Sequence, residues 1–261
     1  MADYETLQVN QRQAVMEVTL SRPKANAFNL QMIDELLSVL KMAGSSEAVR
    51  CVLLTGSGRI FSAGQDVNDF TEANGQVSFR DHLNRTYNRL IPALRRLEKP
   101  ILAAINGPVA GAGLGVALAT DLRIASDRAK FFFGFSGIGL TADSGTSLTL
   151  PMLIGLARAS EMAFTNQPVS AQRALEYGLV NRVVDDDDLR SAAQLWADEL
   201  AQGPTLAIGL IKRAFNQAVL GDLHATLDYE AHLQEIAGRS ADHQEGLAAF
   251  REKRPPEFQG K

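Results

Sequence analysis

The chain has 261 residues, and 46% of them are hydrophobic, which is ample for one large domain or for one domain with an appendage. Its formal net charge of -4 gives no broad basic surface of the kind that favours nucleic acid. The single cysteine, Cys51, excludes a disulfide framework within one chain, and no stretch approaches the ~18 consecutive apolar residues of a membrane span. With no basic-then-apolar leader at the start, we expect a soluble cytoplasmic protein.

Strand-like and helix-like segments alternate through the first half of the chain. Two of the strand-like segments, 49–55 and 101–105, contain short apolar runs, 51–54 and 101–105, of the kind found in strands buried on both faces. The expected strands lie at 13–20, 49–55, 101–105 and 122–125, and the expected helices lie at about 30–43, 77–97 and 111–119. This alternation predicts an α/β core.

The second half of the chain has a different pattern. From Ser144 onward the periodicity is almost wholly helical, interrupted at glycine, proline and aspartate positions. We therefore expect an α/β core over residues 1–200 and a C-terminal helical subdomain over residues 201–261. No internal repeat of solenoid length is present.

Two glycine-containing loops follow predicted strands. Residues 61–66 (Phe-Ser-Ala-Gly-Gln-Asp) come after one strand, and residues 110–115 (Ala-Gly-Ala-Gly-Leu-Gly) come after another and open a helix. Ligands favour the carboxyl ends of strands, and the N–H groups at the start of a helix favour a negative oxygen, so these loops are able to converge on one anion. The alternative is that the glycines only permit tight turns and close helix packing.

Several other functional motifs do not match this sequence. The spacing Gly-x-Gly-x-Gly at residues 111–115 differs from the dinucleotide fingerprint, a P-loop ending is missing, and the nucleophile elbow G-x-S-x-G is absent. All four histidines lie in polar, helix-like segments, where we expect them to face solvent. They are His82, His224, His232 and His243. No ligand cluster indicates a metal site.

The segments in and around the two loops carry a resemblance to a known family. Four of them have the order and spacing of the signature segments of the crotonase (enoyl-CoA hydratase/isomerase) superfamily: Phe61-x-Ala63-Gly64-x-Asp66, residues 104–107, residues 111–113 and residues 121–125. The chain resembles that family over essentially its whole length. The resemblance implies an α/β fold with a crotonase-like core, a ββα superhelix, and a C-terminal helical subdomain. It also implies an acyl-CoA thioester as the substrate.

In that family two main-chain N–H groups bind the oxygen of the thioester. The matching positions here are Gln65, after Ala63-Gly64, and Ala112, after Gly111. An α-carbanion of a thioester is an enolate whose charge gathers on oxygen, so preorganised donors aimed there are worth on the order of 3–4 kcal/mol each. The resemblance therefore implies an oxyanion hole between these two loops.

The acid and base residues decide the reaction within this superfamily. A hydratase carries two glutamates, and the matching positions hold Gly115 and Phe135, neither of which can move a proton. The chain offers Asp143 instead, at the place where family members that isomerise 3-enoyl-CoA or ring-modified phenylacetyl-CoA have their only base. Without the resemblance, Asp143 reads as the N-cap of a helix that begins near Ser144, worth ~1 kcal/mol. We expect Gly115 to make room for an acyl ring.

Three alternatives to the isomerase remain open. A hydratase of relaxed type would use Asp143 to activate water. A 4-chlorobenzoyl-CoA dehalogenase would use it as a nucleophile, but the position of that branch's catalytic histidine holds Asn88, and the position of its ring-contacting tryptophan holds Phe135. A non-catalytic acyl-CoA-binding paralogue would keep the loops and need no Asp143. The isomerase of a phenylacetate-type aromatic degradation pathway is the preferred interpretation.

The resemblance also bears on binding and assembly. Lys24 and Ala25 match positions that contact the CoA adenine, while we expect Asp66 to shape its own loop through hydrogen bonds. Coenzyme A is part of the substrate, and proton transfer needs no metal or other cofactor. The family implies a homotrimer or homohexamer, assembled through the C-terminal helices, with neither nucleic acid nor membrane as a partner.

Overall fold

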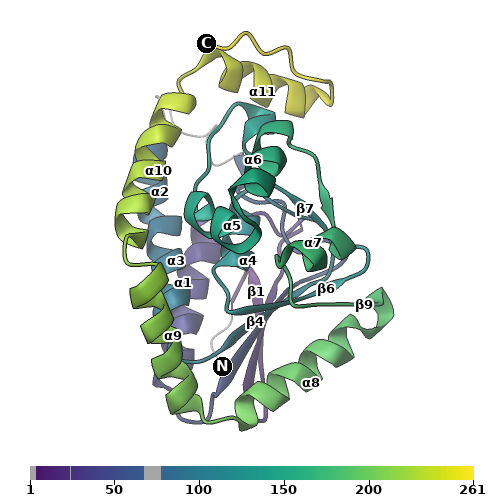
Figure 1. The fold of residues 1–261 in the computed structure, drawn as a ribbon, viewed down its shortest axis with the longest axis vertical. Helices are drawn as coiled ribbons and strands as arrows, with labels where there is room; N and C mark the ends of the chain where they lie inside the picture. The colour runs from purple at the N-terminus through teal and green to yellow at the C-terminus, as the bar shows by residue number, and fades with distance from the viewer. Residues whose placement is uncertain (1–3, 24, 68–77) are drawn as a thin grey trace.

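The computed structural model describes residues 4–23, 25–67 and 78–261 (Figure 1). Over these ranges a central sheet lies between helices, as the α/β prediction requires. No helix in the described ranges is both long enough and apolar enough to cross a membrane.

The central sheet has six strands in the order β1-β2-β3-β4-β6-β9. Their bounds are β1 (Leu7–Arg12), β2 (Val15–Leu20), β3 (Cys51–Gly56), β4 (Ile101–Ile105), β6 (Leu122–Ser126) and β9 (Arg182–Val184). Strand β1 is antiparallel to β2, and the other neighbours are parallel. All five residues of β4 are buried, because helices cover both faces of a parallel sheet.

A smaller sheet of three strands carries the loop that leads into the site. It is formed by β5 (Val109–Ala110), β7 (Lys130–Phe132) and β8 (Val169–Ser170), in that order. Strands β5 and β7 are parallel, and β8 runs antiparallel to β7.

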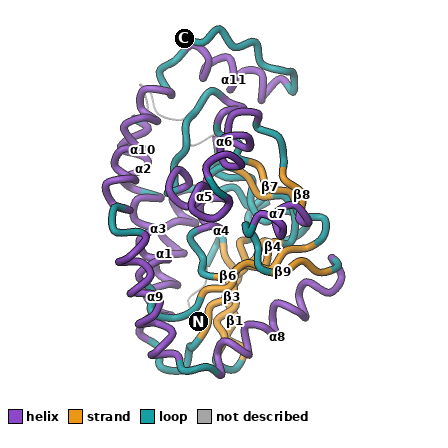
Figure 2. Tube along the Cα trace, in the orientation of Figure 1, coloured by secondary structure: helices purple, strands orange, loops and turns teal. Residues whose placement is uncertain are grey.

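The helices fall into groups that cover the sheet or follow it. Their bounds are α1 (Leu30–Ser45), α2 (Phe79–Arg85), α3 (Tyr87–Arg96), α4 (Ala112–Leu118), α5 (Thr146–Ile154), α6 (Leu156–Thr165), α7 (Ala171–Tyr177), α8 (Leu189–Gln202), α9 (Thr205–Val219), α10 (Leu223–Ala237) and α11 (Ala241–Glu252), with 3-10 turns η2 (Ser136–Ile138) and η3 (Asp186–Asp188). Figure 2 shows α9 and α10 on the same side as α1–α3, with α8 across the sheet from them.

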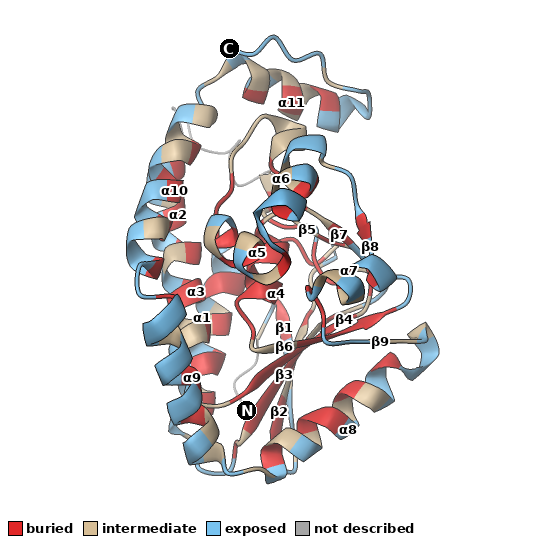
Figure 3. Ribbon diagram, in the orientation of Figure 1, coloured by how far each residue is buried: buried red, intermediate tan, exposed pale blue. Residues whose placement is uncertain are grey.

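Two apolar clusters, one on each face of the central sheet, form the core. The smaller cluster joins Leu53 and Leu102 of the sheet to Trp196 of α8. The larger cluster joins the other sheet face to α1, α3 and α4, and its side chains include Phe28, Leu90 and Leu114. Figure 3 shows strands β3, β4 and β6 and helix α4 as almost wholly buried.

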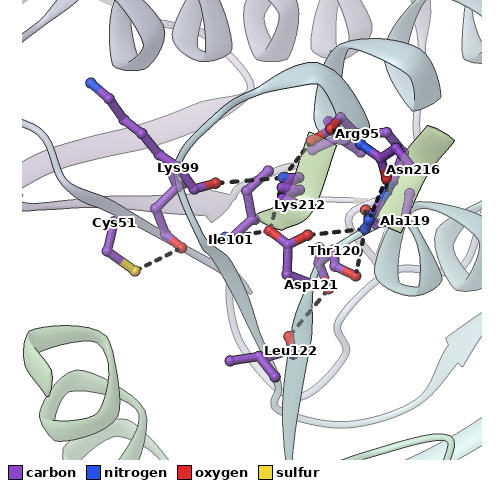
Figure 4. A network of polar contacts seen from close by, with 12 residues as sticks. Cys51, Arg95, Lys99, Ile101, Ala119, Thr120, Asp121, Leu122, Lys212 and Asn216 are labelled. Carbon is purple, nitrogen blue, oxygen red and sulfur yellow. Dashed lines mark hydrogen bonds and ion pairs between the residues drawn. The ribbon is translucent and has the colours of Figure 1, made fainter. Parts of the chain in front are cut away.

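The C-terminal helices are fastened to the core by a buried polar network (Figure 4). Lys212 of α9 is 6% exposed, and its ammonium donates to the Asp121 carboxylate at 2.8 Å and to the Leu94 carbonyl at 2.9 Å. Arg95 of α3 contacts the same carboxylate at 3.0 Å, and its guanidinium donates to Asn216 of α9 at 2.7 Å. One carboxylate thus joins α3 and α9 at the start of β6.

The fold confirms the predicted α/β class, with local differences. The helix expected at 77–97 is two helices, because the backbone at Thr86 leaves the helical region (φ -114°, ψ -97°). Strand β1 was not expected: it is an edge strand with several exposed residues, so it lacks a continuous apolar signal. The division at residue 200 stays a prediction, although α10 packs against α2, α3 and α5.

Candidate active site

A cavity of about 610 Å³ opens where the two predicted loops meet. Its wall is mostly apolar and is built from the loop after β3, the start of α4, helices α2 and α3, the segment after β7, and the C-terminal helices. It is lined by Ala25, Ala27, Ala63, Gly64, Gln65, Asp66, Val67, Phe79, His82, Leu83, Tyr87, Ala110, Gly111, Ala112, Phe132, Gly134, Phe135, Gly137, Ile138, Leu140, Asp143, Asn166, Gln234 and Phe250. Nearly all of the predicted site residues are therefore brought together.

The two glycine-containing loops are held side by side. The N–H of Ala110 donates to the carbonyl of Ser62 at 3.0 Å, and Ser62 forms a parallel bridge with Val109. Gly64 has φ +92°, and a Cβ built there would lie 2.9 Å from the Ala110 carbonyl oxygen and 3.4 Å from the Ala112 nitrogen. Only glycine fits a positive φ with such close approach, so this residue lets the loops meet.

The backbone around Gln65 and Ala112 favours these residues as the two predicted donors. Phe28 pairs with the peptide groups on either side of Gln65, since its N–H donates to Gly64 at 2.7 Å and its carbonyl accepts from Asp66 at 2.8 Å. In a parallel bridge this turns the N–H of Gln65 away from Phe28. Ala112 is the first residue of α4, where an N–H has no acceptor within the helix. Both residues line the cavity.

Asp143 is a buried acid on the cavity wall. It is 7% exposed, and its carboxylate accepts from the Ser144 hydroxyl at 2.7 Å and from the Gln234 amide at 3.0 Å. Burial raises its pKa to about 7; those two hydrogen bonds oppose the shift, and the charge of Glu230 adds to it. A carboxyl group with a pKa near neutrality is able both to take and to return a proton.

The alternative role of Asp143 as a helix cap does not fit the geometry. Helix α5 begins at Thr146, and its N-cap is Gly145, which has no side chain to make a capping hydrogen bond. The carboxylate of Asp143 is engaged by Ser144 and Gln234 instead.

The segment after β7 contributes apolar side chains to the wall of the cavity that Asp143 lines. Phe135, Ile138 and Leu140 line the cavity, and the ring of Phe133 packs edge-on against that of Phe135 with centroids 5.1 Å apart. Phe131 is fully buried in the core and is not part of the cavity wall.

The expectation that Gly115 makes room for an acyl ring is corrected by its position. Gly115 is not among the residues that line the cavity. A Cβ built there would lie 2.5 Å from the Cβ of Ser144 and 2.9 Å from the hydroxyl oxygen of Thr146. The missing side chain therefore makes room for the turn that carries Asp143.

The predicted CoA-side residues are only partly described. Ala25 lines the cavity, and its carbonyl accepts the Ala63 N–H at 3.0 Å. Asp66 pairs with Arg22 at 3.0 Å, and Arg22 also donates to the Ala27 carbonyl at 2.7 Å, so this pair braces the loop. Lys24 lies outside the described residues.

The expectation for two of the four histidines was wrong. His82 lines the cavity, with its Nε2 3.1 Å from the side-chain oxygen of Gln65, and burial lowers its pKa to about 4. His243 is 4% exposed, and its Nδ1 lies 2.8 Å from the Ile138 carbonyl oxygen. His224 and His232 are exposed as expected.

Sequence reasoning also missed Tyr87, Glu230 and Gln234. The Tyr87 hydroxyl donates to the side chain of Gln65 at 2.8 Å, and Gln234 donates to Asp143. Glu230 and Gln234 stand four residues apart on α10, on the face that buries Leu227. Two polar residues on an apolar helical face were the available signal. Within the described ranges no group of three or more histidine, cysteine or acidic side chains is arranged to hold a metal ion.

The chain is similar to known proteins of one family. The family model for enoyl-CoA hydratase/isomerase matches residues 10–261. The chain is 44% identical over 250 residues to "1,2-epoxyphenylacetyl-CoA isomerase" of Escherichia coli (strain K12), covering 95% of each chain. It is 39% identical over 259 residues to "Probable enoyl-CoA hydratase" of Rhodobacter capsulatus, covering 99% of each. A solved enoyl-CoA hydratase from Mycobacterium avium subsp. paratuberculosis superimposes with a TM-score of 0.88 at 31% identity, covering 98% of this chain and 100% of the other.

Proposed function

The chain belongs to the enoyl-CoA hydratase/isomerase family, whose members act on CoA thioesters, and on that premise we propose that it is an acyl-CoA isomerase with Asp143 as its single acid/base group. The 44% identical isomerase supports this choice within the family. The observation that carries it is the acid content of the cavity. Among the described residues that line it, the acids are Asp66, which pairs with Arg22, and Asp143.

The reaction is a proton transfer within the acyl group. The thioester oxygen lies between the N–H groups of Gln65 and Ala112, and the Asp143 carboxylate removes a proton from the α carbon to give the enolate. The enolate charge gathers on oxygen, where two oriented donors stabilise it most. Protonated Asp143 then returns the same proton to the γ carbon, so that a 3-enoyl-CoA becomes the conjugated 2-enoyl-CoA with no change in mass.

The raised pKa of Asp143 suits one group that does both steps. A carboxyl with an ordinary pKa would hold an abstracted proton too weakly to deliver it before losing it to water. Burial raises the pKa of Asp143 to about 7, so the group is ionised at the start of the cycle and acidic enough to protonate an enolate at its end.

The size and lining of the cavity indicate which acyl groups it accepts. Its volume of about 610 Å³ and its aromatic wall, which includes Phe79, Phe135 and Phe250, suit a ring or a medium-length chain. We therefore include ring-modified phenylacetyl-CoA, such as a ring 1,2-epoxide, among the substrates and place the enzyme in a phenylacetate-type degradation pathway.

Three competing activities are less well supported by the site. A two-glutamate hydratase is disfavoured because Gly115 is packed against Ser144 and Phe135 is apolar. A dehalogenase lacks its histidine, since Asn88 lies outside the cavity lining and donates to the Leu227 carbonyl at 3.3 Å. A non-catalytic paralogue gives no reason for a carboxyl group buried with a pKa near 7.

The remaining expectations stay part of the proposal. Proton transfer by Asp143 calls for no resident cofactor, because coenzyme A arrives with the substrate. The exposed apolar side chains of α9, which include Leu206, Leu210 and Phe215, support assembly into a homotrimer or homohexamer. A cytoplasmic location fits an enzyme of soluble CoA thioesters.

One experiment separates isomerase from hydratase. The wild-type enzyme is incubated with a 3-enoyl-CoA in ¹⁸O-labelled water, and the product is followed by ultraviolet absorbance and mass spectrometry. The isomerase gives a conjugated product of unchanged mass. A product that carries labelled oxygen, or no conversion, would refute the proposal.

A further inference from the structure

The turn that carries Asp143 has an unusual backbone. Ser144 has φ +56° and Gly145 has φ +72°, so two successive residues are in the left-handed region. A non-glycine residue rarely adopts that region unless its surroundings hold it there. The turn leads directly into α5, and the Thr146 N–H donates to the Asp143 carbonyl at 3.0 Å.

The surroundings that hold the turn come from α10. One carboxylate oxygen of Glu230 accepts the Gly145 N–H at 2.8 Å, and the other accepts the Ser147 N–H at 2.9 Å and the Ser147 hydroxyl. Glu230 is 3% exposed, and no described lysine or arginine forms an ion pair with it. Burying a carboxylate that has no ion-pair partner costs free energy, and here three hydrogen-bond donors at the start of α5 offset that cost.

The same helix also contacts the side chain of Asp143. Gln234 lies one turn after Glu230, and it donates to the Asp143 carboxylate at 3.0 Å while accepting the Thr141 N–H at 3.1 Å. Residues four apart share one helical face, so α10 contacts the turn both before and after Asp143.

We propose that Glu230 is a positioning residue for Asp143, which fixes the left-handed turn at Ser144 and Gly145 and so aims the Asp143 carboxylate at the substrate carbon. This inference rests on the proposed isomerase function of the same site. Nothing in the alignment of loops or signature segments points to Glu230, which stands 87 residues beyond Asp143 in the sequence.

Glu230 also acts on Asp143 through its charge. Its negative charge raises the pKa of Asp143, in the same direction as burial. Among the described residues, three other titratable groups line the cavity: His82 of α2, which burial keeps neutral, Tyr87 of α3, which donates to Gln65, and Asp66, which pairs with Arg22. The remaining charged residues of α2 and α3 are Arg80, which pairs with Asp228 of α10, Asp81, Arg85, Arg89, Arg95 and Arg96, and those of α10 include Asp228 and Glu235. Helix α5 has no charged residue. Neutralising Glu230 is therefore expected to lower the pKa of Asp143.

The test uses Glu230→Gln, with Asp228→Asn as the matched control that removes one charge from the exposed side of α10. We expect Glu230→Gln to lower kcat on a 3-enoyl-CoA by ~10-fold or more with KM changed by less than ~3-fold, and to move the acid limb of kcat/KM to lower pH by about half a unit. Asp228→Asn keeps wild-type values. A Glu230→Gln protein with wild-type kcat and acid limb overturns the inference.

Two further measurements keep the test decisive. If Glu230→Gln does not fold, the test uses Glu230→Asp, which keeps the negative charge but moves the carboxylate away from the turn. A lower kcat with a wild-type acid limb supports the inference, and a wild-type kcat overturns it. The pKa of Asp143 is also read without substrate, by carbon-13 NMR of carboxyl-labelled aspartate with the resonance identified by its loss in Asp143→Asn. An inactive wild type refutes the isomerase function, whereas an Asp143 pKa unchanged in Glu230→Gln refutes the coupling.

Discussion

Gly115 and Ser144 touch where the middle of α4 meets the turn that carries Asp143. A Cβ on Gly115 would lie 2.5 Å from the Cβ of Ser144 and 2.9 Å from its carbonyl oxygen. Ser144 is 1% exposed and donates to Asp143, so it has no room to retreat without moving that carboxylate. A side chain at position 115 and the present placement of Asp143 are therefore mutually exclusive.

The first prediction concerns that contact. Gly115→Ala is expected to displace Ser144 and to lower kcat by ~10-fold or more, because misplacing a catalytic group by about 1 Å is enough for such a loss. Gly44→Ala is the control, since a Cβ there meets only Leu97 at an ordinary 3.5 Å. Steady-state kinetics on a 3-enoyl-CoA checks both variants. A wild-type kcat in Gly115→Ala would contradict the prediction, because it would show that Ser144 moves aside without misplacing Asp143.

The second prediction concerns the loop that presents Gln65. Gly64→Ala puts a methyl group 2.9 Å from the Ala110 carbonyl oxygen at φ +92°, so the two loops must separate. Loss of one oriented oxyanion donor lowers kcat by ~10²–10³. The measurement is kcat for the isomerisation, with circular dichroism as the test that the fold is kept. A folded variant with kcat within a few-fold of wild type would argue against the oxyanion hole.

The third prediction concerns the pH dependence of the reaction. Asp143 must be ionised to take a proton, and its pKa is raised to about 7, so kcat/KM should fall as the pH drops through about 7. His82 has a pKa lowered to about 4 and stays neutral across that range. A profile of kcat/KM from pH 5 to 9, about two units either side, checks this. A flat profile down to pH 5 would mean that the base has an ordinary carboxyl pKa.

The fourth prediction concerns stability. Between about pH 4 and pH 7 the unfolded chain holds Asp143 ionised while the folded protein holds it protonated, so the folded state loses stability as the pH rises, and the loss is complete above pH 7. Asp143→Asn removes this penalty. The stability of the variant relative to wild type should therefore rise from pH 5 to pH 8 in denaturant titrations. A constant difference would contradict the raised pKa.

The fifth prediction concerns the attachment of α9. Lys212→Met leaves Asp121 without one of its two cations in a buried network and should lower the free energy of unfolding by ~3 kcal/mol. The neighbouring Arg213→Met removes an exposed pair with Glu98, which is worth ~0–1 kcal/mol. Denaturant titrations of the two variants measure the contrast, and equal losses would show that burial does not distinguish the pairs.

The predictable part of the site is local in sequence. The loops around Gln65 and Ala112 carry their glycines in short segments, and Asp143 lies in a segment that the family resemblance singles out. The role of Gly115 could not be predicted, because its neighbour Ser144 is 29 residues away and the contact exists only after α4 and α5 pack.

The contribution of the C-terminal helices could not be predicted either, because it also depends on contacts between residues far apart in the sequence. Gln234 reaches Asp143 across 91 residues of sequence, and His82 turns inward because α2 packs its face with Phe79 and Leu83 against the cavity. Helical periodicity locates such elements but does not say which of their polar residues face a site. The predicted fold class was secure because alternating strands and helices leave few arrangements.

The measurement that tests the central claim most directly compares wild type with Asp143→Asn on a 3-enoyl-CoA, side by side, by the rise in absorbance of the conjugated thioester. We predict conversion by the wild type and a loss of at least ~10³-fold in kcat for the variant, with CoA-ester binding retained, because the single base is gone. Equal rates for the two proteins would contradict the account and assign the proton transfer to another group.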